Sequence, residues 1–509
     1  MLTGFRVQNF KAFEDTGLID IKSLVLLSGV NSAGKSSIFQ ALLLLKQTLE
    51  SGPGQVLQPD GPLFFGTPDS FLFDSNENLV YGLNFAYNTQ YNKENFTGLV
   101  HVTTGSDIEL IKALKVAFPD INQVANGKNL ACDLKISLAW GKFGYLTQRE
   151  VRVNSLQVDI KVDSKPLLSL SIDIQASIES YKLTLNKEKT VPELHNLAID
   201  QLKIDSFDHF LPESLIILQS GKNNSLRRDV SPRITRFLRR LFKNIQNDLS
   251  EKVYYLSSFR ERPRRFYGYS STTKSLDPKG SNFPQVMWQH KDDRTEFVPP
   301  RQSHSDRAKL DKMPLYETTD WILHNILELK QHIVVQPING GQDVIEVTVQ
   351  TLGEKSTQVT LADVGLGYNQ ILPVIVQGLL TPIGGLVIFE QPEIHLHPDV
   401  QAKLIKFFVG LAKSGRRVLV ETHSSHMIEH LCLEIAQDDT NSLAQNVQTL
   451  FVHAPDQTHQ SPHIEKIEIT PYGEILNWPK SFLPDVAALD EEIIKAGFTK
   501  RQKEQESPA

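Results

Sequence analysis

The sequence predicts an α/β fold whose centre is a sheet of short parallel strands. Residues 23–28 (SLVLLS) form an apolar, strand-like run, and residues 36–50 (SSIFQALLLLKQTLE) follow as a helix. Near the C-terminus, residues 386–389 (LVIF) have the pattern of a buried parallel strand, and residues 417–420 (RVLV) form another strand. Short alternating runs between residues 76 and 220 predict an additional antiparallel lobe.

The loop between the first strand and its helix carries the strongest functional signal. It fits the pattern G-x-x-x-x-G-K-[ST], and a chance match is disfavoured by the strand before it and the helix after it. Glycines let backbone N–H groups turn inward around phosphates, while Lys35 supplies a charge for the β- and γ-phosphates and the Ser36 hydroxyl can ligate Mg²⁺. We therefore expect ATP and Mg²⁺ to bind at Gly29, Asn31, Ser32, Ala33, Gly34, Lys35, Ser36 and Ser37.

Composition limits the class of protein. The chain has 509 residues and a formal net charge of −6, which excludes a uniformly basic nucleic-acid binder but allows a local basic patch. Two cysteines are too few for a disulfide framework or a four-cysteine zinc site, so we expect a cytoplasmic protein. Residues 371–389 are uncharged over about the length of a membrane helix. Pro382, Gly384 and Gly385 break this run, which predicts a buried helix followed by a strand.

The N-terminal strand and the glycine-rich loop together resemble a known family. Residues 5–13 (FRVQNFKAF), followed by the loop with Asn31 and its doubled serine, resemble the head domains of ABC-type ATPases that act on DNA. These include the structural-maintenance, RecF and overcoming-lysogenization-defect groups. The resemblance implies a P-loop NTPase fold of ABC head type with a β-rich lobe and a large insertion. It also implies that Lys11 approaches the nucleotide, although a solvated surface lysine is the alternative.

Two more parts of such a head follow the buried strands near the C-terminus. Glu390 comes directly after residues 386–389, and an acid at the carboxyl end of such a strand lies beside the P-loop. Glu390 is therefore expected to hold Mg²⁺ together with Ser36, directly or through water. The resemblance makes His423, after the next strand, the switch histidine that hydrogen-bonds the γ-phosphate. The alternative for His423 is a structural or surface residue.

A candidate signature motif precedes these strands. Residues 361–373 (LADVGLGYNQILP) resemble the segment that opens a helix and, in ABC-type dimers, covers the γ-phosphate of the partner's nucleotide. Gly365 would take the place usually held by serine, and Gly367 that of the motif's glycine. A plain glycine-rich turn is the alternative.

The expected catalytic position is unusual. Glu390 corresponds to the acid of the Walker B motif. Most ABC-type ATPases have a glutamate directly after that acid, whereas this chain has Gln391. An amide cannot accept a proton as a base but can orient water, and Glu393 is the nearest carboxylate that could substitute. We expect slow hydrolysis and a long-lived ATP-bound dimer. His395 and His397 could join Glu393 in a metal site, but the resemblance makes this turn the D-loop at the dimer interface.

A closer resemblance covers both ends of the chain. The sequences DVGLG at 363–367, EQPEIHLHP at 390–398 and ETHS at 421–424, with YLSSFRERP at 255–263, resemble one bacterial family. It contains AAA/ABC-type ATPases with a C-terminal domain of unknown function, related to overcoming-lysogenization-defect and Septu-type ATPases of anti-phage defence. Residues 467–482 look like that C-terminal domain. Many relatives have a serine where this chain has Asn369, so a hydroxyl contact from that position is in doubt.

A basic stretch in the middle of the chain could contact nucleic acid. Arginine and lysine strongly outnumber acidic residues between Arg227 and Arg265, and Arg233, Arg236, Arg240 and Lys243 fall on one helical face. A solvated face, or ion pairs within a dimer, is the alternative. The segment 268–312 is expected to be a long loop, followed by a helix at 318–331.

Together these patterns predict five regions. They are the N-terminal part of the head (1–75), a β-rich lobe (76–226), a basic helical and loop region (227–344), the C-terminal part of the head (345–455) and a small appendage (456–509). Since no nuclease motif is evident, we expect a slow ATPase that forms a homodimer or higher oligomer and gates a separate effector. The resemblance implies that this effector is a nuclease or toxin of bacterial anti-phage defence. The alternatives are a RecF-like DNA-binding ATPase and, less favoured, a transporter subunit; no membrane contact is expected.

Overall fold

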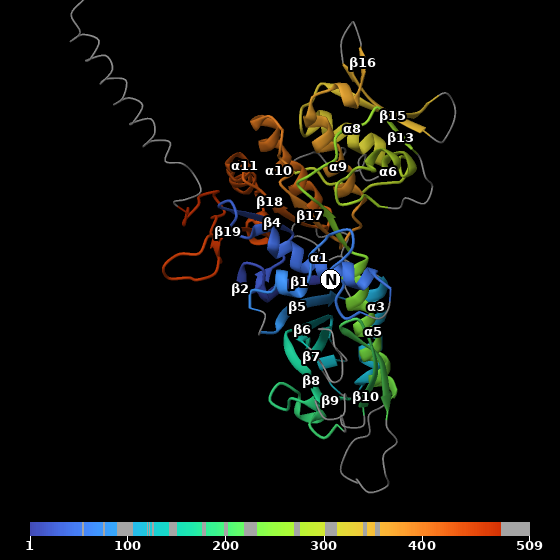
Figure 1. The fold of residues 1–509 in the computed structure, drawn as a ribbon, viewed down its shortest axis with the longest axis vertical. Coiled ribbons are helices and arrows are strands. Elements are labelled where there is room, and N and C mark those ends of the chain that lie inside the picture. Colours follow the sequence, from blue (N-terminus) through green and yellow to red (C-terminus); the bar gives the residue numbers. More distant parts are fainter. Residues whose placement is uncertain are drawn as a thin grey trace, which may run out of the picture.

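The structure is a computed structural model that describes residues 1–52, 55–74, 77–88, 105–119, 121, 123–124, 127–141, 150–175, 180–197, 202–217, 232–268, 275–300, 313–338, 344–351 and 357–479. Figure 1 shows a central sheet with an antiparallel lobe on one side and a smaller sheet with helices on the other. Arg227, Arg228 and residues 480–482 of the predicted C-terminal domain lie outside the described residues.

The central sheet has six strands in the order β12-β17-β18-β4-β19-β20. The first five are parallel, and β20 is antiparallel to β19. Every residue of β4, β17 and β18 is buried, as their continuously apolar sequences predict. The strands are β4 (Leu24–Gly29), β12 (Val253–Leu256), β17 (Leu386–Glu390), β18 (Arg417–Glu421), β19 (Val447–His453) and β20 (His463–Ile467).

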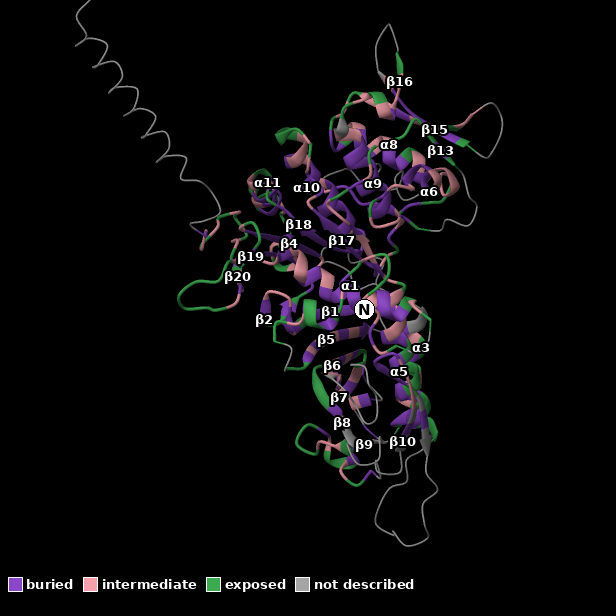
Figure 2. Cartoon of the chain, viewed as in Figure 1, coloured by how far each residue is buried: buried purple, intermediate pink, exposed green. Residues whose placement is uncertain are grey.

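This sheet separates two hydrophobic cores, because alternate side chains of a strand point to opposite faces. Val25 and Leu27 pack toward the antiparallel lobe, whereas Leu24 and Leu26 pack toward the other core. Figure 2 shows both sides of the sheet as buried. The flanking helices are α1 (Lys35–Glu50), α9 (Leu366–Leu380), α10 (Pro398–Lys413), α11 (Ser425–Ala436) and α12 (Ser442–Asn446).

The uncharged run 371–389 forms the buried helix α9 and the buried strand β17, as predicted. They are joined by a turn in which Gly384 has a φ of 81°. Within the described residues, every helix is too short or too polar to cross a membrane.

The antiparallel lobe has the strand order β2-β1-β5-β6-β7-β8-β9, with β3 paired to β1. Helices α3 and α5 pack beside it, and β10 and β11 form a separate hairpin. The elements are β1 (Leu2–Phe10), β2 (Phe13–Asp15), β3 (Ile19–Asp20), α2 (Pro68–Phe71), β5 (Leu79–Asn88), α3 (Gly105–Ala117), β6 (Asn129–Gly141), β7 (Glu150–Val162), β8 (Lys165–Gln175), β9 (Ser180–Leu185), β10 (Leu202–Asp208), β11 (Leu211–Ile217) and α5 (Pro232–Ser250). The predicted β-rich lobe is confirmed.

A smaller sheet has the order β13-β15-β14, with β16 paired to β15. Its elements are β13 (Phe266–Gly268), α6 (Phe283–Gln289), α8 (Leu315–Asn325), β14 (Gln331–Pro337), β15 (Val344–Thr351) and β16 (Gln358–Thr360). Two expectations were wrong here. The described part of the segment 268–312 contains helix α6, and α8 stops six residues before the predicted 331, where β14 begins. The β-branched run at 333–335 (IVV) favours a strand there.

The elements cross the expected boundaries along the chain. Strand β12, from the region 227–344, pairs in parallel with β17, and β20, from the region 456–509, extends the same sheet through β19. The pair β14–β15 likewise joins residues on both sides of the 344/345 boundary.

Candidate functional site

The loop Gly29–Ser37 lies between the end of β4 and the start of α1. Two positions in this loop, Gly29 and Gly34, require glycine because of their backbone conformation and close neighbours. Gly29 has a φ of 148°, and a Cβ there would lie 2.4 Å from the carbonyl oxygen of Val452 on β19. Gly34 has a φ of 90°, and its Cβ would lie 3.0 Å from the Phe13 ring. The loop is thus held tightly against neighbouring strands, with the N-terminus of α1 open to an anion.

The ammonium of Lys35 points back into this loop. Its Nζ donates to the carbonyl oxygens of Gly29 at 3.0 Å and Val30 at 2.7 Å. Burial lowers the pKa of Lys35, and the nearby carboxylate of Glu421 opposes that shift. An ammonium that is desolvated and held by two neutral carbonyls is well placed to exchange them for phosphate oxygens, which are charged acceptors.

The carboxylate that contacts the loop directly is that of Glu421, a residue that the sequence prediction missed. The Ser36 hydroxyl donates to Glu421 Oε2 at 2.9 Å. Glu421 ends β18, the strand that lies between β4 and β17, so it is closer in the sheet to the loop than Glu390 is. The missed signal was an acid directly after a buried strand, the same pattern that identified Glu390.

Glu390 and Glu421 are neighbours in the register of β17 and β18. Burial and then the charge of Glu421 raise the pKa of Glu390 to about 7, although hydrogen bonds from the Tyr255 hydroxyl and the Ser258 backbone oppose the shift. Oε1 of Glu390 is buried, and no described group hydrogen-bonds to it. Two buried carboxylates, one with an orphaned oxygen, beside a serine hydroxyl form a donor set that fits Mg²⁺, which prefers oxygen ligands.

The residues expected to handle the attacking water lie at the same ends of β17 and β18. The Gln391 N–H donates to the carbonyl oxygen of Glu421 at 2.8 Å, and Gln391 has a φ of 41°. Glu393 is buried, and its Oε1 accepts from the Thr422 hydroxyl at 2.7 Å and the His423 N–H at 2.8 Å. Burial raises the pKa of Glu393 against these hydrogen bonds.

His423 lies close enough to Lys35 for their charges to interact. Although its side chain is largely exposed, surrounding protein and the charge of Lys35 together lower its pKa, which favours the neutral imidazole at pH 7. A neutral ring can donate a hydrogen bond from one nitrogen without adding charge to the site.

Arg260 connects the predicted signature helix to the end of β17. It is buried, and its Nη1 donates to Gln370 Oε1 on α9 at 2.8 Å, while Nη2 donates to the carbonyl oxygen of Glu390 at 3.3 Å. Burial lowers the pKa of Arg260 to about 10, opposed by the charges of Glu393 and Glu390. The sequence counts Arg260 with the basic stretch between Arg227 and Arg265, but its guanidinium is buried in the site.

Comparison with known proteins identifies the family. The AAA ATPase domain family matches residues 1–428 of the chain. The chain belongs to this AAA ATPase domain family. No curated protein of similar sequence was found.

Among solved structures, a structural-maintenance head bound to the C-terminal winged-helix domain of ScpA matches with 8% identity and a TM-score of 0.35, covering 92% of this chain and 97% of that one. The head domain from Thermotoga maritima matches with 8% identity and a TM-score of 0.34, covering 92% of this chain and 99% of that one. A structural-maintenance head with an extended coiled coil, bound to the C-terminal domain of ScpA from Pyrococcus furiosus, matches with 9% identity and a TM-score of 0.33, covering 92% of this chain and 96% of that one.

The family and the sheet order together confirm the predicted fold class, an α/β P-loop NTPase of ABC head type with a β-rich lobe and a large insertion. In this ATPase domain, Gly365 precedes α9 and Gly367 lies in its first turn. A Cβ on Gly367 would lie 3.6 Å from the carbonyl oxygen of His395, so the predicted signature packs against the predicted D-loop of its own chain. His397 caps α10 by accepting from the Asp399 N–H at 3.3 Å.

Lys11 lies near the site, and its ammonium contacts Gln40 and the Phe65 ring. Its Nζ donates to Gln40 Oε1 at 2.6 Å and lies 5.5 Å from the centre of the Phe65 ring. Burial lowers the pKa of Lys11, and the charge of Glu390 opposes that shift. Asn31 and Ser32 are exposed at the tip of the loop, Ser37 is half-buried and Ala33 is buried.

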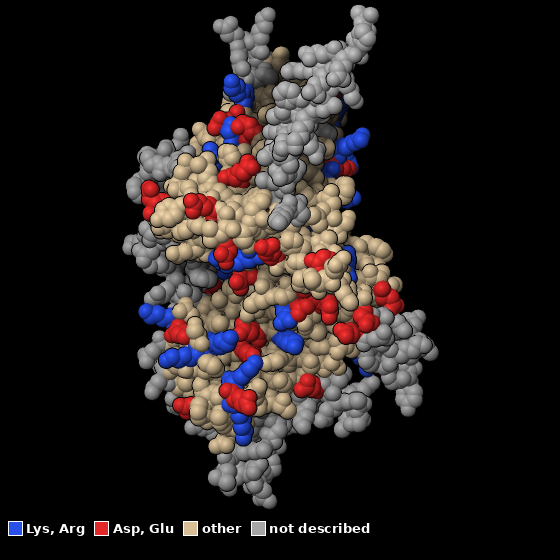
Figure 3. Space-filling model, turned by 90° about the vertical axis from the view of Figure 1, so that its left-hand side faces the viewer, with Lys and Arg blue, Asp and Glu red and all other residues tan. Residues whose placement is uncertain are grey.

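The rest of the basic stretch divides into two environments. On α5, Arg233, Arg236, Arg240 and Lys243 are exposed, while Arg240 pairs with Glu109 at 3.2 Å. Farther along, Arg264 pairs with Glu261, and Arg265 pairs with Asp363 at 3.0 Å. On the face drawn in Figure 3, acidic and basic side chains are interspersed.

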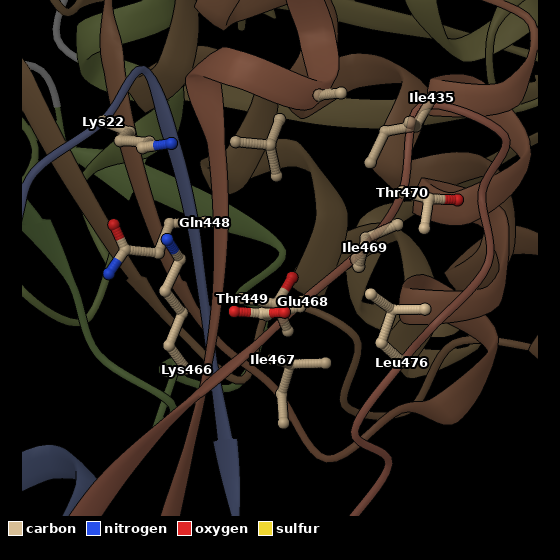
Figure 4. Close-up of a pocket in the computed structure, with 12 residues that line it drawn as sticks. Lys22, Ile435, Gln448, Thr449, Lys466, Ile467, Glu468, Ile469, Thr470 and Leu476 are labelled. Atoms are coloured by element: carbon tan, nitrogen blue, oxygen red, sulfur yellow. The ribbon is translucent and has the colours of Figure 1, made fainter.

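A separate pocket of about 260 Å³ lies at the β19–β20 edge of the central sheet. Lys22, Lys466 and Glu468 line it together with apolar side chains such as Ile469 and Leu476 (Figure 4). None of the residues assigned above to the nucleotide site lines this pocket.

Proposed function

We propose that the chain is a slow Mg²⁺-dependent ATPase that dimerises head-to-head around two ATP molecules and gates a separate effector. The observation that carries the proposal is the hydrogen bond from Ser36 to Glu421, with Glu390 next to it on the adjacent strand. It brings the P-loop hydroxyl to two buried carboxylates, as a Mg²⁺·ATP site requires.

In the proposed mechanism, backbone N–H groups of Gly29–Ser37 and the Lys35 ammonium bind the phosphates. Ser36, Glu421 and Glu390 would hold Mg²⁺, which when bound neutralises charge on the β- and γ-phosphates. The geometry of the orphaned Glu390 Oε1 supports this role.

The attacking water is positioned by Gln391, whose amide can donate and accept hydrogen bonds but is no base. Glu393 would accept the proton, since its raised pKa brings it nearer to neutrality and its Oε2 is buried without a hydrogen-bond partner among the described residues. His423 would hydrogen-bond the γ-phosphate as a neutral ring. With no carboxylate directly after Glu390, hydrolysis is slow and the ATP-bound state is long-lived.

Gly365 and Gly367 of one chain would cover the nucleotide of the other chain. Arg260 supports this coupling because it hydrogen-bonds Gln370, one helical turn after Gly367, and also the backbone of Glu390. A shift of the signature helix on dimerisation would therefore move Arg260 and, through it, the metal-binding end of β17.

The effector is proposed to be a nuclease or toxin of bacterial anti-phage defence. Support for this setting comes from the resemblance of residues 363–367, 390–398 and 421–424 to ATPases of that kind, and from the tail at 467–482. Cytoplasmic location belongs to the same proposal.

The test measures the mass of the purified chain by mass photometry with and without Mg²⁺·ATP, alone and with the product of the adjacent gene. Wild type should shift to a dimer or larger oligomer only with nucleotide, whereas Lys35→Ala should remain in its nucleotide-free state. Glu188→Gln, an exposed acid in the antiparallel lobe, is the matched control. Nucleotide-dependent assembly that survives in Lys35→Ala refutes the model.

A RecF-like DNA-binding ATPase is the second candidate, and the exposed basic face of α5 favours it. If this face binds phosphates, DNA should stimulate ATP hydrolysis and the double variant Arg236→Glu/Arg240→Glu should abolish the stimulation. ATP hydrolysis that ignores DNA removes this candidate.

A further inference from the structure

A second cluster of metal-binding side chains lies outside the nucleotide site, between helix α8 and strand β14. It consists of Asp320 and His324 on α8 and His332 on β14. One ligand atom from each lies within 4.8 Å of the other two. We propose that these three residues form a site for a divalent transition metal of the zinc class.

The local fold explains why these residues meet. Tyr316, Asp320 and His324 are spaced four apart, so they form one row along α8. The Tyr316 hydroxyl donates to the carbonyl oxygen of Ile333, which places this row against the start of β14. The adjacent His332 then faces Asp320, and its Nδ1 lies 2.8 Å from Oδ2 and 3.1 Å from Oδ1 of that carboxylate.

The hydrogen bonds of both histidines leave a lone pair on Nε2. His324 Nδ1 lies 2.8 Å from the carbonyl oxygen of Asp320, an acceptor only, so Nδ1 carries the proton. His332 Nδ1 donates to the Asp320 carboxylate in the same way. His324 thus has the arrangement of a metal-binding histidine, in which one ring nitrogen donates to a carbonyl and the other is unprotonated.

The strongest sign of a ligand is His324 Nε2, which is buried and has no hydrogen-bond partner among the described residues. Burying such an acceptor unpaired is unfavourable, and a metal ion would satisfy it. The two imidazole rings have centroids 4.3 Å apart with planes tilted by 39°, and the Nδ1 atoms of His324 and His332 lie 3.6 Å and 2.8 Å from Asp320 Oδ2.

Two imidazoles and one carboxylate suit zinc and its neighbours in the first transition row. Tetrahedral zinc with bonds of about 2.1 Å needs ligand atoms about 3.4 Å apart. The present atoms lie within 4.8 Å of one another and reach this spacing when the His332 side chain, which is 42% exposed, rotates. The rotation breaks the hydrogen bond between His332 and Asp320 and frees the carboxylate to bind the ion. That exposure also gives the ion access and leaves room for water as a fourth ligand.

Such an ion would join α8 to β14 beside the signature helix. Gln331, next to His332, accepts a hydrogen bond from the Tyr368 hydroxyl on α9. The metal site therefore adjoins the first turns of the helix that carries Gly367, and it makes no use of the nucleotide site.

The experiment uses the full-length, tag-free chain with Lys35→Ala as background, so that its result does not depend on ATP binding. After chelation and dialysis, the chain is titrated with Co²⁺ and separately with Zn²⁺, and bound metal is measured by visible absorption and by mass spectrometry. One ion per chain and a d–d band are expected. Both should be lost in His324→Ala and in His332→Gln, with circular dichroism confirming that each variant folds.

The chain offers a matched control in a second group, Asp456, His459 and His463. There the His459 and His463 rings are stacked 4.1 Å apart, and Asp456 Oδ1 already accepts hydrogen bonds from the Thr458 and His459 backbones. His459→Ala/His463→Ala should keep the bound metal. The proposal is overturned if the chain that keeps His324 and His332 binds no more metal than His324→Ala or His332→Gln does. It is also overturned if only the control variant His459→Ala/His463→Ala loses the metal.

Discussion

Binding of Mg²⁺·ATP should release a proton from Glu390. Burial and the neighbouring Glu421 raise the pKa of Glu390 to about 7 in the nucleotide-free chain. A divalent cation at this carboxylate would favour the ionised form strongly. Binding therefore removes whatever proton Glu390 carries beforehand.

The size of this effect follows from the pKa. With a pKa of about 7, the carboxyl group holds about 0.9 proton at pH 6, about 0.5 at pH 7 and about 0.1 at pH 8. The affinity for Mg²⁺·ATP should therefore fall as pH drops through 7, approaching about tenfold per pH unit below it. Above pH 8 the dependence on this group should vanish.

The raised pKa of Glu390 has the opposite effect on folding: as pH rises, affinity for Mg²⁺·ATP increases but the stability of the nucleotide-free chain decreases. Since the folded pKa of Glu390 is raised from 4.5 to about 7, the folded state binds the proton more tightly than the unfolded state. Stability is thus lost as pH rises from about 4.5 to 7, by up to about 3 kcal/mol. Glu390→Gln should stabilise the nucleotide-free chain at pH 8 and have little effect on its stability at pH 4.5.

The assay is calorimetric titration at pH 7 in buffers of different ionisation enthalpy, which yields the number of protons released. Wild type should release about half a proton more than Glu390→Gln, because the amide does not titrate. Glu188→Gln should match wild type. Equal proton release by wild type and Glu390→Gln would refute the assignment of the raised pKa to Glu390.

Two more substitutions test the loop and the base. Gly29→Ala should lower the free energy of unfolding by about 1–3 kcal/mol and weaken ATP binding, because its Cβ would lie 2.4 Å from the Val452 carbonyl oxygen. Gly365→Ala is the control and should fold normally, because its Cβ would meet open space. Urea unfolding and ATP titration measure these effects. Glu393→Gln should bind ATP but abolish turnover in a phosphate-release assay, and unchanged turnover would remove Glu393 as the base.

Much of the central fold was predictable because its signals are local. The apolar runs of β4 and β17 and the loop glycines are each visible within a few residues. The four-residue strand β12 (VYYL) is rich in strand-favouring residues, but only its parallel pairing with β17 makes it part of this sheet.

The parts of the site that were missed depend on contacts between distant segments. Glu421 follows a buried strand just as Glu390 does, but only the order β17-β18-β4 shows that Glu421 reaches Ser36. Arg260 looked like one of many surface cations because a charge count carries no information on burial. Its role follows from Gln370, 110 positions away in the chain.

The central claim is that Lys35 and Ser36, with Glu421 and Glu390, form one Mg²⁺·ATP site. The most direct test is equilibrium titration of ATP into the chain, with Mg²⁺ and with EDTA, for wild type and Lys35→Ala. One ATP per chain, bound much more weakly in EDTA and lost in Lys35→Ala, is the predicted result. ATP binding that persists unchanged in Lys35→Ala, or no binding by wild type, would contradict it.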